Sequence, residues 1–235
     1  MRYALYFTPP ASHGLTLAAA RWLGRNAFTG AALEQPAAEG FDRAALASLT
    51  ADPRRYGFHA TLKAPFELAQ GCCEADLVAE IGRFSAQAEP FDIPSVVIDR
   101  LGSFFAFVPQ AECAPLQSFA ADVVRYFEPF RAPLREADIA RRNPEKMSEA
   151  ERSNLMDWGY PYVFETFRFH MTLTGRVPEG EAASMQLALY RHFGEHHGSP
   201  LAIGGLALFR EPARGADFTV HSLFPLGSAT NRKSA

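Results

Sequence analysis

The sequence lacks the marks of several protein classes. It has three cysteines in 235 residues, and two of them, Cys72 and Cys73, are adjacent, while Cys113 stands alone. An odd count without regular spacing does not make a disulfide framework, so we expect reduced thiols. The apolar start at residues 3–7 is too short for a signal core, and no apolar run is long enough to cross a bilayer. These absences predict a cytoplasmic protein with no membrane partner.

Strong charge of one sign is also missing. The formal net charge is −3, which offers no general attraction for nucleic acid. We find no strip of mixed aromatic and basic residues, so we do not expect long nucleic acid as a partner. Glycine patterns such as that at 204–205 do not form a common phosphate loop. Five of the seven histidines have no metal-ligand spacing: His13, His192, His196, His197 and His221. We therefore predict no metal and no cofactor, and the oligomeric state stays open.

Short alternating elements fill most of the chain. Hydrophobic residues make up 48%, as in a folded globular domain. Strand patterns occur at 3–8, 57–66, 93–100, 103–108, 163–175, 201–209 and 217–225. Helical patterns occur at 14–24, 40–50, 74–88, 114–128 and 180–195. Hairpins recur without the regular rhythm of a parallel sheet, so the pattern predicts an α+β fold with antiparallel sheets.

The two halves of the chain repeat one order of elements. Each has a strand with Phe-His-x-Thr-Leu, then a helix, then a hairpin. We predict one bilobal domain over 1–235, with lobe one at about 1–110, lobe two at about 111–227, two antiparallel sheets and a central cleft. A charged segment at 131–162 interrupts the repeat and is expected to be a helical insertion. The small, polar tail from Gly227 is expected to be frayed.

The repeated pentapeptide carries the chemistry. Alternate residues of a strand face the same side, so each histidine projects beside the threonine two positions later, while the apolar residues turn to the core. These pairs are His59 with Thr61 and His170 with Thr172. A lone histidine in a half-buried strand is usually structural. A core, however, has no reason to place the same pair twice, so we expect both pairs to meet in one cleft.

Such a cleft suits cleavage of a phosphodiester. The reaction needs a base that takes a proton and an acid that protonates the leaving oxygen, and imidazole titrates near neutrality. Threonine hydroxyls can donate to the phosphate oxygens as charge shifts there, and no metal is required. The sequence leaves open which histidine is the base.

The paired motifs resemble those of the 2H phosphoesterase superfamily. The stretches RYGFHATLKAPF, WGYPYVFETFRFHMTLTGR and RYALYF resemble, more narrowly, an uncharacterised branch associated with bacterial phosphonate-utilisation operons. The resemblance implies a bilobal antiparallel fold, catalytic roles for His59 and His170, phosphate binding by Thr61 and Thr172, and a small sugar cyclic phosphate as substrate. Two alternatives remain: a non-catalytic module that holds a phosphorylated ligand, and an RNA end-processing or ligase-like enzyme.

Four further residues are secondary candidates. Lys63 follows the first histidine by four positions and is expected on the same strand face, and Arg176 follows the second histidine by six. Either could neutralise phosphate, or be a solvated surface cation. Tyr56 and Tyr162 could line the cleft or simply pack.

The insertion at 131–162 has two possible roles. It contains a helical pattern at 145–158 and ends in a stiff aromatic turn that leads toward the second motif. It could cover the cleft mouth and supply an arginine or a tyrosine to a small ligand. It could also be a peripheral appendage or a dimer contact, because charged helices usually face solvent.

Overall fold

The computed structural model describes residues 1–227, so most of the tail that we expected to be frayed lies outside the described residues. The strands are β1 (Arg2–Phe7), β2 (Ala60–Phe66), β3 (Phe91–Leu101), β4 (Phe104–Pro109), β5 (Met171–Thr172), β6 (Ser199–Ile203), β7 (Gly205–Glu211) and β8 (Thr219–Pro225). The α-helices are α1 (Gly14–Leu23), α2 (Arg43–Leu49), α3 (Ala51–Tyr56), α4 (Glu74–Gln87), α5 (Ala114–Tyr126), α6 (Glu136–Ala140), α7 (Glu149–Trp158) and α8 (Ala182–Phe193). Most of the predicted elements are therefore present.

The strands form one antiparallel sheet in the order β6-β3-β4-β5-β2-β1-β7-β8. The α+β class and the antiparallel pairing are confirmed, but the expectation of two sheets is wrong. The reason is β5, which pairs with β2 through Met171 and Ala60, and with β4 through Thr172 and Ala106. This two-residue strand joins the group β6-β3-β4 to the group β2-β1-β7-β8, which would otherwise be two separate sheets.

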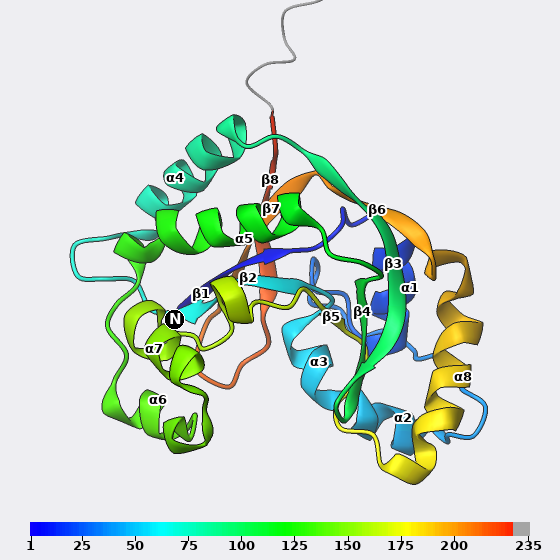
Figure 1. Cartoon of the computed structure of the whole chain (residues 1–235). Coiled ribbons are helices and arrows are strands. Elements are labelled where there is room, and N and C mark those ends of the chain that lie inside the picture. Colours follow the sequence, from blue (N-terminus) through cyan, green and yellow to red (C-terminus); the bar gives the residue numbers. More distant parts are fainter. Residues whose placement is uncertain (228–235) are drawn as a thin grey trace, which may run out of the picture.

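The sheet curls, because its two ends are joined by very little chain. Strand β6 is at one edge and β7 is next to the opposite edge, yet only Gly204 separates them. The single strand predicted at 201–209 is thus two strands that belong to opposite ends of the sheet. The strand order also mixes the two expected lobes, since β3 and β4 lie beside β5 and β6 while β1 and β2 lie beside β7 and β8. Figure 1 shows the resulting curved arrangement.

One face of the sheet is covered by helices. The main apolar core joins alternate residues of the central strands to α1, α4, α5 and α8, and includes Leu5, Ala60 and Met171. A second, smaller cluster lies on the other face and consists of Ala4, Tyr6, Ala27, Ala207, Phe209 and Phe218. The strand period assigns neighbouring residues to opposite faces. Thr61 of β2 and Thr172 of β5, which lie between core positions, therefore point away from the helix layer.

The insertion folds into α6 and α7, on one side of the molecule (Figure 1). Helix α7 starts later than predicted because Ser148 and Glu151 form a capping box, in which each side chain meets the other residue's backbone N–H. It ends at Gly159, whose φ of 75° lies in the left-handed region that glycine adopts most easily. Among the described residues, no helix is long and apolar enough to cross a bilayer.

Candidate active site

The two repeated motifs lie on neighbouring strands. Ala60 is paired with Met171 in antiparallel register, so each histidine lies opposite the threonine of the other motif. Ala60 and Met171 are fully buried in the core beneath the helices. The histidine and the threonine of each motif lie on the opposite face: His59, Thr61, His170 and Thr172. All four are partly exposed, which leaves them accessible to a ligand.

Both imidazoles are held in the same way. Nδ1 of His59 lies 2.9 Å from the carbonyl oxygen of Gly57, and Nδ1 of His170 lies 2.7 Å from that of Arg168. A carbonyl oxygen can only accept a hydrogen bond, so Nδ1 carries the proton in each ring. Nε2 is then the position that gains or loses a proton. In His59 this atom lies 3.3 Å from the hydroxyl oxygen of Thr61.

Burial keeps both histidines neutral. It lowers the pKa of His59 to about 4, and a charge on His170 would lower it further, while the Gly57 carbonyl opposes the shift. Burial also lowers the pKa of His170, and the Arg168 carbonyl opposes that shift. A charge on His170 therefore acts on His59, and the pKa of His59 is lowered more strongly than that of His170.

Aromatic side chains flank the pair. The ring of Tyr6 stacks on His59 with 3.9 Å between ring centres, and the Tyr56 ring lies 6.0 Å from His59. On the other side, Phe104 lies 5.8 Å from His170. The stack on Tyr6 fixes the plane of the His59 ring and contributes to its desolvation.

The insertion reaches this region through two residues that the sequence did not single out. The guanidinium of Arg142 lies 5.1 Å from the ring centre of Tyr160. Burial raises the pKa of Tyr160 to about 12, with Tyr162 and Tyr56 adding to the rise and Arg142 opposing it. The pKa of Tyr6 is raised by burial first and also by Tyr56 and Tyr160, so these three rings share one environment. Tyr162, the predicted candidate, is 47% exposed and contacts Tyr160 edge-on.

Lys63 does not share the face of the histidines, contrary to our expectation. Its side chain is buried, and Nζ lies 2.7 Å from the Glu128 carboxylate and 3.1 Å from the carbonyl oxygen of Val124, in α5. The cause is a β-bulge: Tyr6 pairs with Thr61 but Leu5 pairs with Lys63. One extra residue in β2 reverses the alternation and turns Lys63 toward the helices.

Two other arginines flank the second motif, Arg168 before it and Arg176 after it. Arg176 is exposed, follows the end of β5 by four residues, and has no ion pair within residues 1–227. Arg168 is also exposed, and exposure alternates along 167–172, so it shares the face of His170. Its position two residues before that histidine was the signal that could have identified it.

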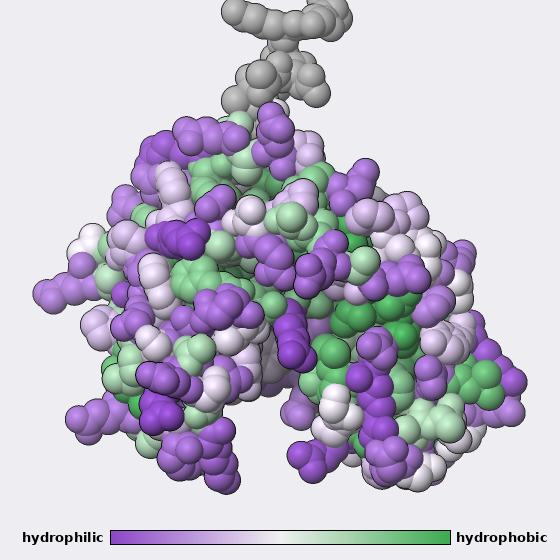
Figure 2. Space-filling model, in the orientation of Figure 1, coloured by the Kyte–Doolittle hydropathy of each residue, from purple (hydrophilic) through white to green (hydrophobic). Residues whose placement is uncertain are grey.

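The surface is hollowed between the side that carries α6 and α7 and the side that carries α2 and α3 (Figure 2). Strands β2 and β5 lie between these two sides (Figure 1). Within the described part of the chain, no group of three or more His, Cys, Asp or Glu side chains is placed to hold a metal ion. We take this hollow as the place of the paired imidazoles and hydroxyls, because β2 and β5 lie between its two sides.

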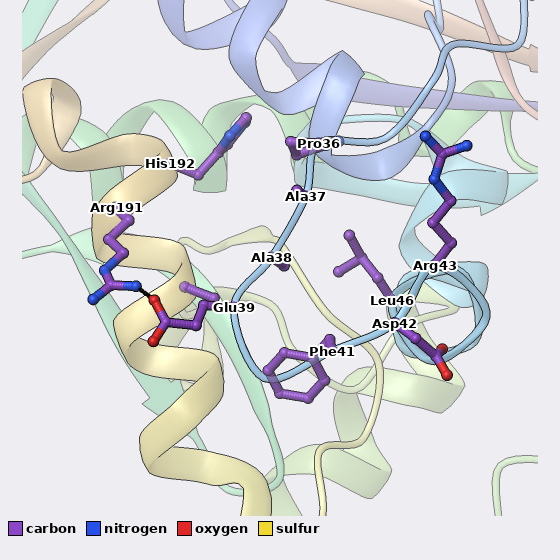
Figure 3. Close-up of a pocket in the computed structure, with 11 residues that line it drawn as sticks. Pro36, Ala37, Ala38, Glu39, Phe41, Asp42, Arg43, Leu46, Arg191 and His192 are labelled. Atoms are coloured by element: carbon purple, nitrogen blue, oxygen red, sulfur yellow. Dashed lines mark ion pairs between the residues drawn. The ribbon is translucent and has the colours of Figure 1, made fainter.

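A cavity of about 610 Å³ lies elsewhere, between α8 and the loop before α2 (Figure 3). Apolar residues such as Phe41 and Leu46 line part of it, and an ion pair between Arg191 and Glu39 crosses one side. Neither motif histidine lines this cavity. It is thus separate from the paired-histidine cleft.

The fold and the cleft define an α+β protein in which one antiparallel sheet presents two equivalent His-x-Thr pairs on its open face. Residues 61–219 match the family described as "Protein of unknown function (DUF1045)", and the chain belongs to this family.

Two curated relatives are named ribose 1,5-bisphosphate phosphokinase PhnN. The protein from Janthinobacterium sp. (strain Marseille) is 37% identical over 99% of this chain and 52% of its own length. The protein from Laribacter hongkongensis (strain HLHK9) is 35% identical over 93% of this chain and 50% of its own length. The chain thus spans about half the length of these relatives. The crystal structure of the Thermus thermophilus protein TT0787 aligns over 97% of this chain and 98% of its own, with 16% identity and a TM-score of 0.47.

Proposed function

We propose that the protein cleaves a small cyclic phosphodiester, a sugar or nucleotide cyclic phosphate, in the manner of the 2H phosphoesterases that its motifs resemble. The observation that carries the proposal is the equivalence of the two histidines. Each immediately precedes one of two adjacent antiparallel strands, and each Nδ1 is hydrogen-bonded to the carbonyl oxygen two residues before it. Such equivalence fits an acid and a base that act on the two sides of one phosphate.

We assign the base to His59 and the acid to His170. The pKa of His59 is lowered to about 4, so its Nε2 is free to take a proton from the attacking water or hydroxyl. A bound phosphate anion raises the pKa of His170, which then protonates the leaving oxygen as the P–O bond breaks. The hydroxyls of Thr61 and Thr172, with the guanidinium of Arg168, donate to the non-bridging oxygens.

The relatives support a small phosphorylated sugar. Their name specifies ribose 1,5-bisphosphate, a sugar with two phosphates, and they match this chain along almost its whole length. This chain has neither of the common glycine-rich phosphate loops. We therefore assign the phosphokinase activity of the relatives to the half that this chain does not match. A role in phosphonate utilisation, implied by the resemblance of the motifs, belongs to the same proposal.

A non-catalytic module that binds a phosphorylated ligand is the second candidate. It is favoured by one observation: burial lowers the pKa of both histidines, so neither imidazole is a ready proton donor at neutral pH. The enzyme and the binding module differ in one respect: in the enzyme, the bound anion raises the pKa of His170 enough for this imidazole to carry a proton.

Turnover assays separate them. The chain would be given ribose cyclic phosphates, nucleoside 2′,3′-cyclic phosphates and short RNA with a cyclic end, all with a chelator present. We expect hydrolysis of a small cyclic phosphate, and loss of it in His59→Ala and His170→Ala but not in the control His221→Ala. Ligand binding with no turnover of any substrate would select the binding module. Preference for the RNA would select the end-processing alternative.

A further inference from the structure

An arginine-rich junction joins the insertion to the sheet. A small cavity there is lined by six arginines but only two acidic residues, Glu67 and Asp138. The arginines are Arg2, Arg131, Arg135, Arg141, Arg142 and Arg214. Such an excess of positive charge at a partly buried surface needs either ion pairs within the protein or an anion from outside.

Five of the six arginines have an ion pair. Arg2 pairs with Glu211, Arg131 with Glu128, Arg135 with Glu67, Arg141 with Asp138, and Arg214 with both Glu67 and Asp138. Arg214 takes both oxygens of Asp138, at 2.6 and 3.0 Å. Arg142 has no ion pair and no side-chain hydrogen bond with any residue in the described range 1–227.

The unpaired guanidinium is held on the side of the cleft. Arg142 is half-buried and stacks over Tyr160, a residue whose hydroxyl makes no hydrogen bond within residues 1–227. Tyr56, which neighbours both, is also 6.0 Å from His59. Arg142 and Tyr160 thus have Tyr56 as a shared neighbour with His59. Within residues 1–227, no hydrogen bond, ion pair or ring contact joins Arg142 or Tyr160 to either motif histidine, so we place Arg142 beside the histidine pair and not within it.

We propose that Arg142, with the Tyr160 hydroxyl, binds a second anionic group of the substrate, a phosphomonoester. The inference rests on the proposed function, because it takes the histidine pair as the site of the cyclic phosphate. The substrate class is then a sugar cyclic phosphate that carries a phosphomonoester at its far end. A guanidinium provides two parallel N–H donors to phosphate oxygens, and the tyrosine hydroxyl provides a third donor.

Paired substrates and a paired control test this site. Ribose cyclic phosphate would be compared with and without a 5-phosphate, in the native protein, Arg142→Gln and Arg141→Gln. Losing a charged hydrogen-bond partner should raise the KM of the phosphorylated substrate about 10–100-fold in Arg142→Gln. In Arg142→Gln, the KM of the unphosphorylated substrate should stay within about twofold of that of the native protein. In Arg141→Gln, the KM of each of the two substrates should also stay within about twofold of the native value. Equal changes for both substrates, or none, would overturn the inference.

The variant should fold normally, because Arg142 makes no ion pair that its loss would break. Arg142→Lys keeps the charge without the two-pronged donor, so it should restore part of the lost affinity. If no cyclic phosphate is turned over, the proposed function fails but the second site can still be measured. Calorimetric titration with ribose 5-phosphate should then show binding to the native protein that weakens at least tenfold in Arg142→Gln, and equal binding to both would overturn the site.

Discussion

The strands that carry the histidines and the insertion that reaches toward them are held by different forces. Strands β2 and β5 are fixed by backbone pairing and by fully buried residues such as Ala60 and Met171. The α6–α7 insertion buries little apolar surface, with Leu155 the main fully buried side chain of α7, and is tied down by ion pairs around Asp138 and Arg214. Salt screens the attraction in partly exposed ion pairs, whereas apolar packing has no charge to be screened. Under the proposed function, the reacting groups lie on the strands fixed by apolar packing, and the groups that select the substrate lie on the insertion held by ion pairs.

Removing either histidine tests the rigid region most severely. His59→Ala or His170→Ala should lower kcat about 10²–10⁴-fold, because each removes one proton-transfer partner. The measurement is steady-state turnover of the best cyclic phosphate. The double variant should cost little more than either single one, since acid and base act as a unit. Additive losses would mean that the residues act independently.

The threonines should have a smaller effect. Thr61→Val and Thr172→Val each delete a donor to charged oxygen while keeping the shape of the side chain, and each should cost about 1–3 kcal/mol in kcat/KM. Thr219→Val on β8, remote from the motifs, is the control and should leave kcat/KM unchanged. If both motif variants behave like this control, the hydroxyls serve only as strand formers.

The pH dependence of stability reports on His59. Its pKa is lowered to about 4 in the folded protein, against about 6.5 in an unfolded chain. Between these values the unfolded chain binds the proton and the folded chain does not. The unfolding free energy should therefore fall by about 1–2 kcal/mol from pH 7 to pH 5. Denaturant titration of the native protein and of His59→Asn would measure this, and an equal fall in both would contradict the assignment.

The insertion should loosen without disturbing the histidines. Asp138→Asn weakens the pairing with Arg214, and we expect a loss of about 1 kcal/mol because Arg214 is partly exposed. Hydrogen exchange should quicken in α6 and α7 but not in β2 and β5, and salt should have the same effect. Asp122→Asn, which breaks only an exposed pair with Arg125, is the control. Faster exchange throughout the sheet would show that the two regions are not independent.

The sequence could predict what depends on local patterns, but not what depends on pairing between distant strands. Local patterns placed most elements, and strand alternation put His59 beside Thr61 on the open face. Local patterns could not reveal that Ala60 pairs with Met171, 111 residues away along the chain, which makes one sheet of the expected two. Nor could they show the bulge that turns Lys63 to the helices. Both features depend on pairing between distant strands.

In the insertion, the sequence pointed to the aromatic turn and to Tyr162, and the structure adds Tyr160 as the residue that contacts Arg142. Tyr160 and Tyr162 have the same chemistry and are two residues apart, and only the packing of the turn directs Tyr160 to Arg142 and leaves Tyr162 exposed. The sequence also could not predict that Arg142 lacks an ion pair within residues 1–227. That depends on the fold, which pairs Asp138 with Arg141 and Arg214 instead.

The pH profile of kcat/KM for a small cyclic phosphate, measured with a chelator present, tests the central claim most directly. The base must be neutral and the acid protonated, so the profile should be bell-shaped. Because burial lowers the pKa of both histidines, its maximum should lie on the acid side of neutrality. The residual activity of His59→Ala should lose the rising limb and that of His170→Ala the falling limb. A profile that keeps both limbs in both variants, or activity that disappears with the chelator and returns with added metal, would contradict a paired-histidine mechanism.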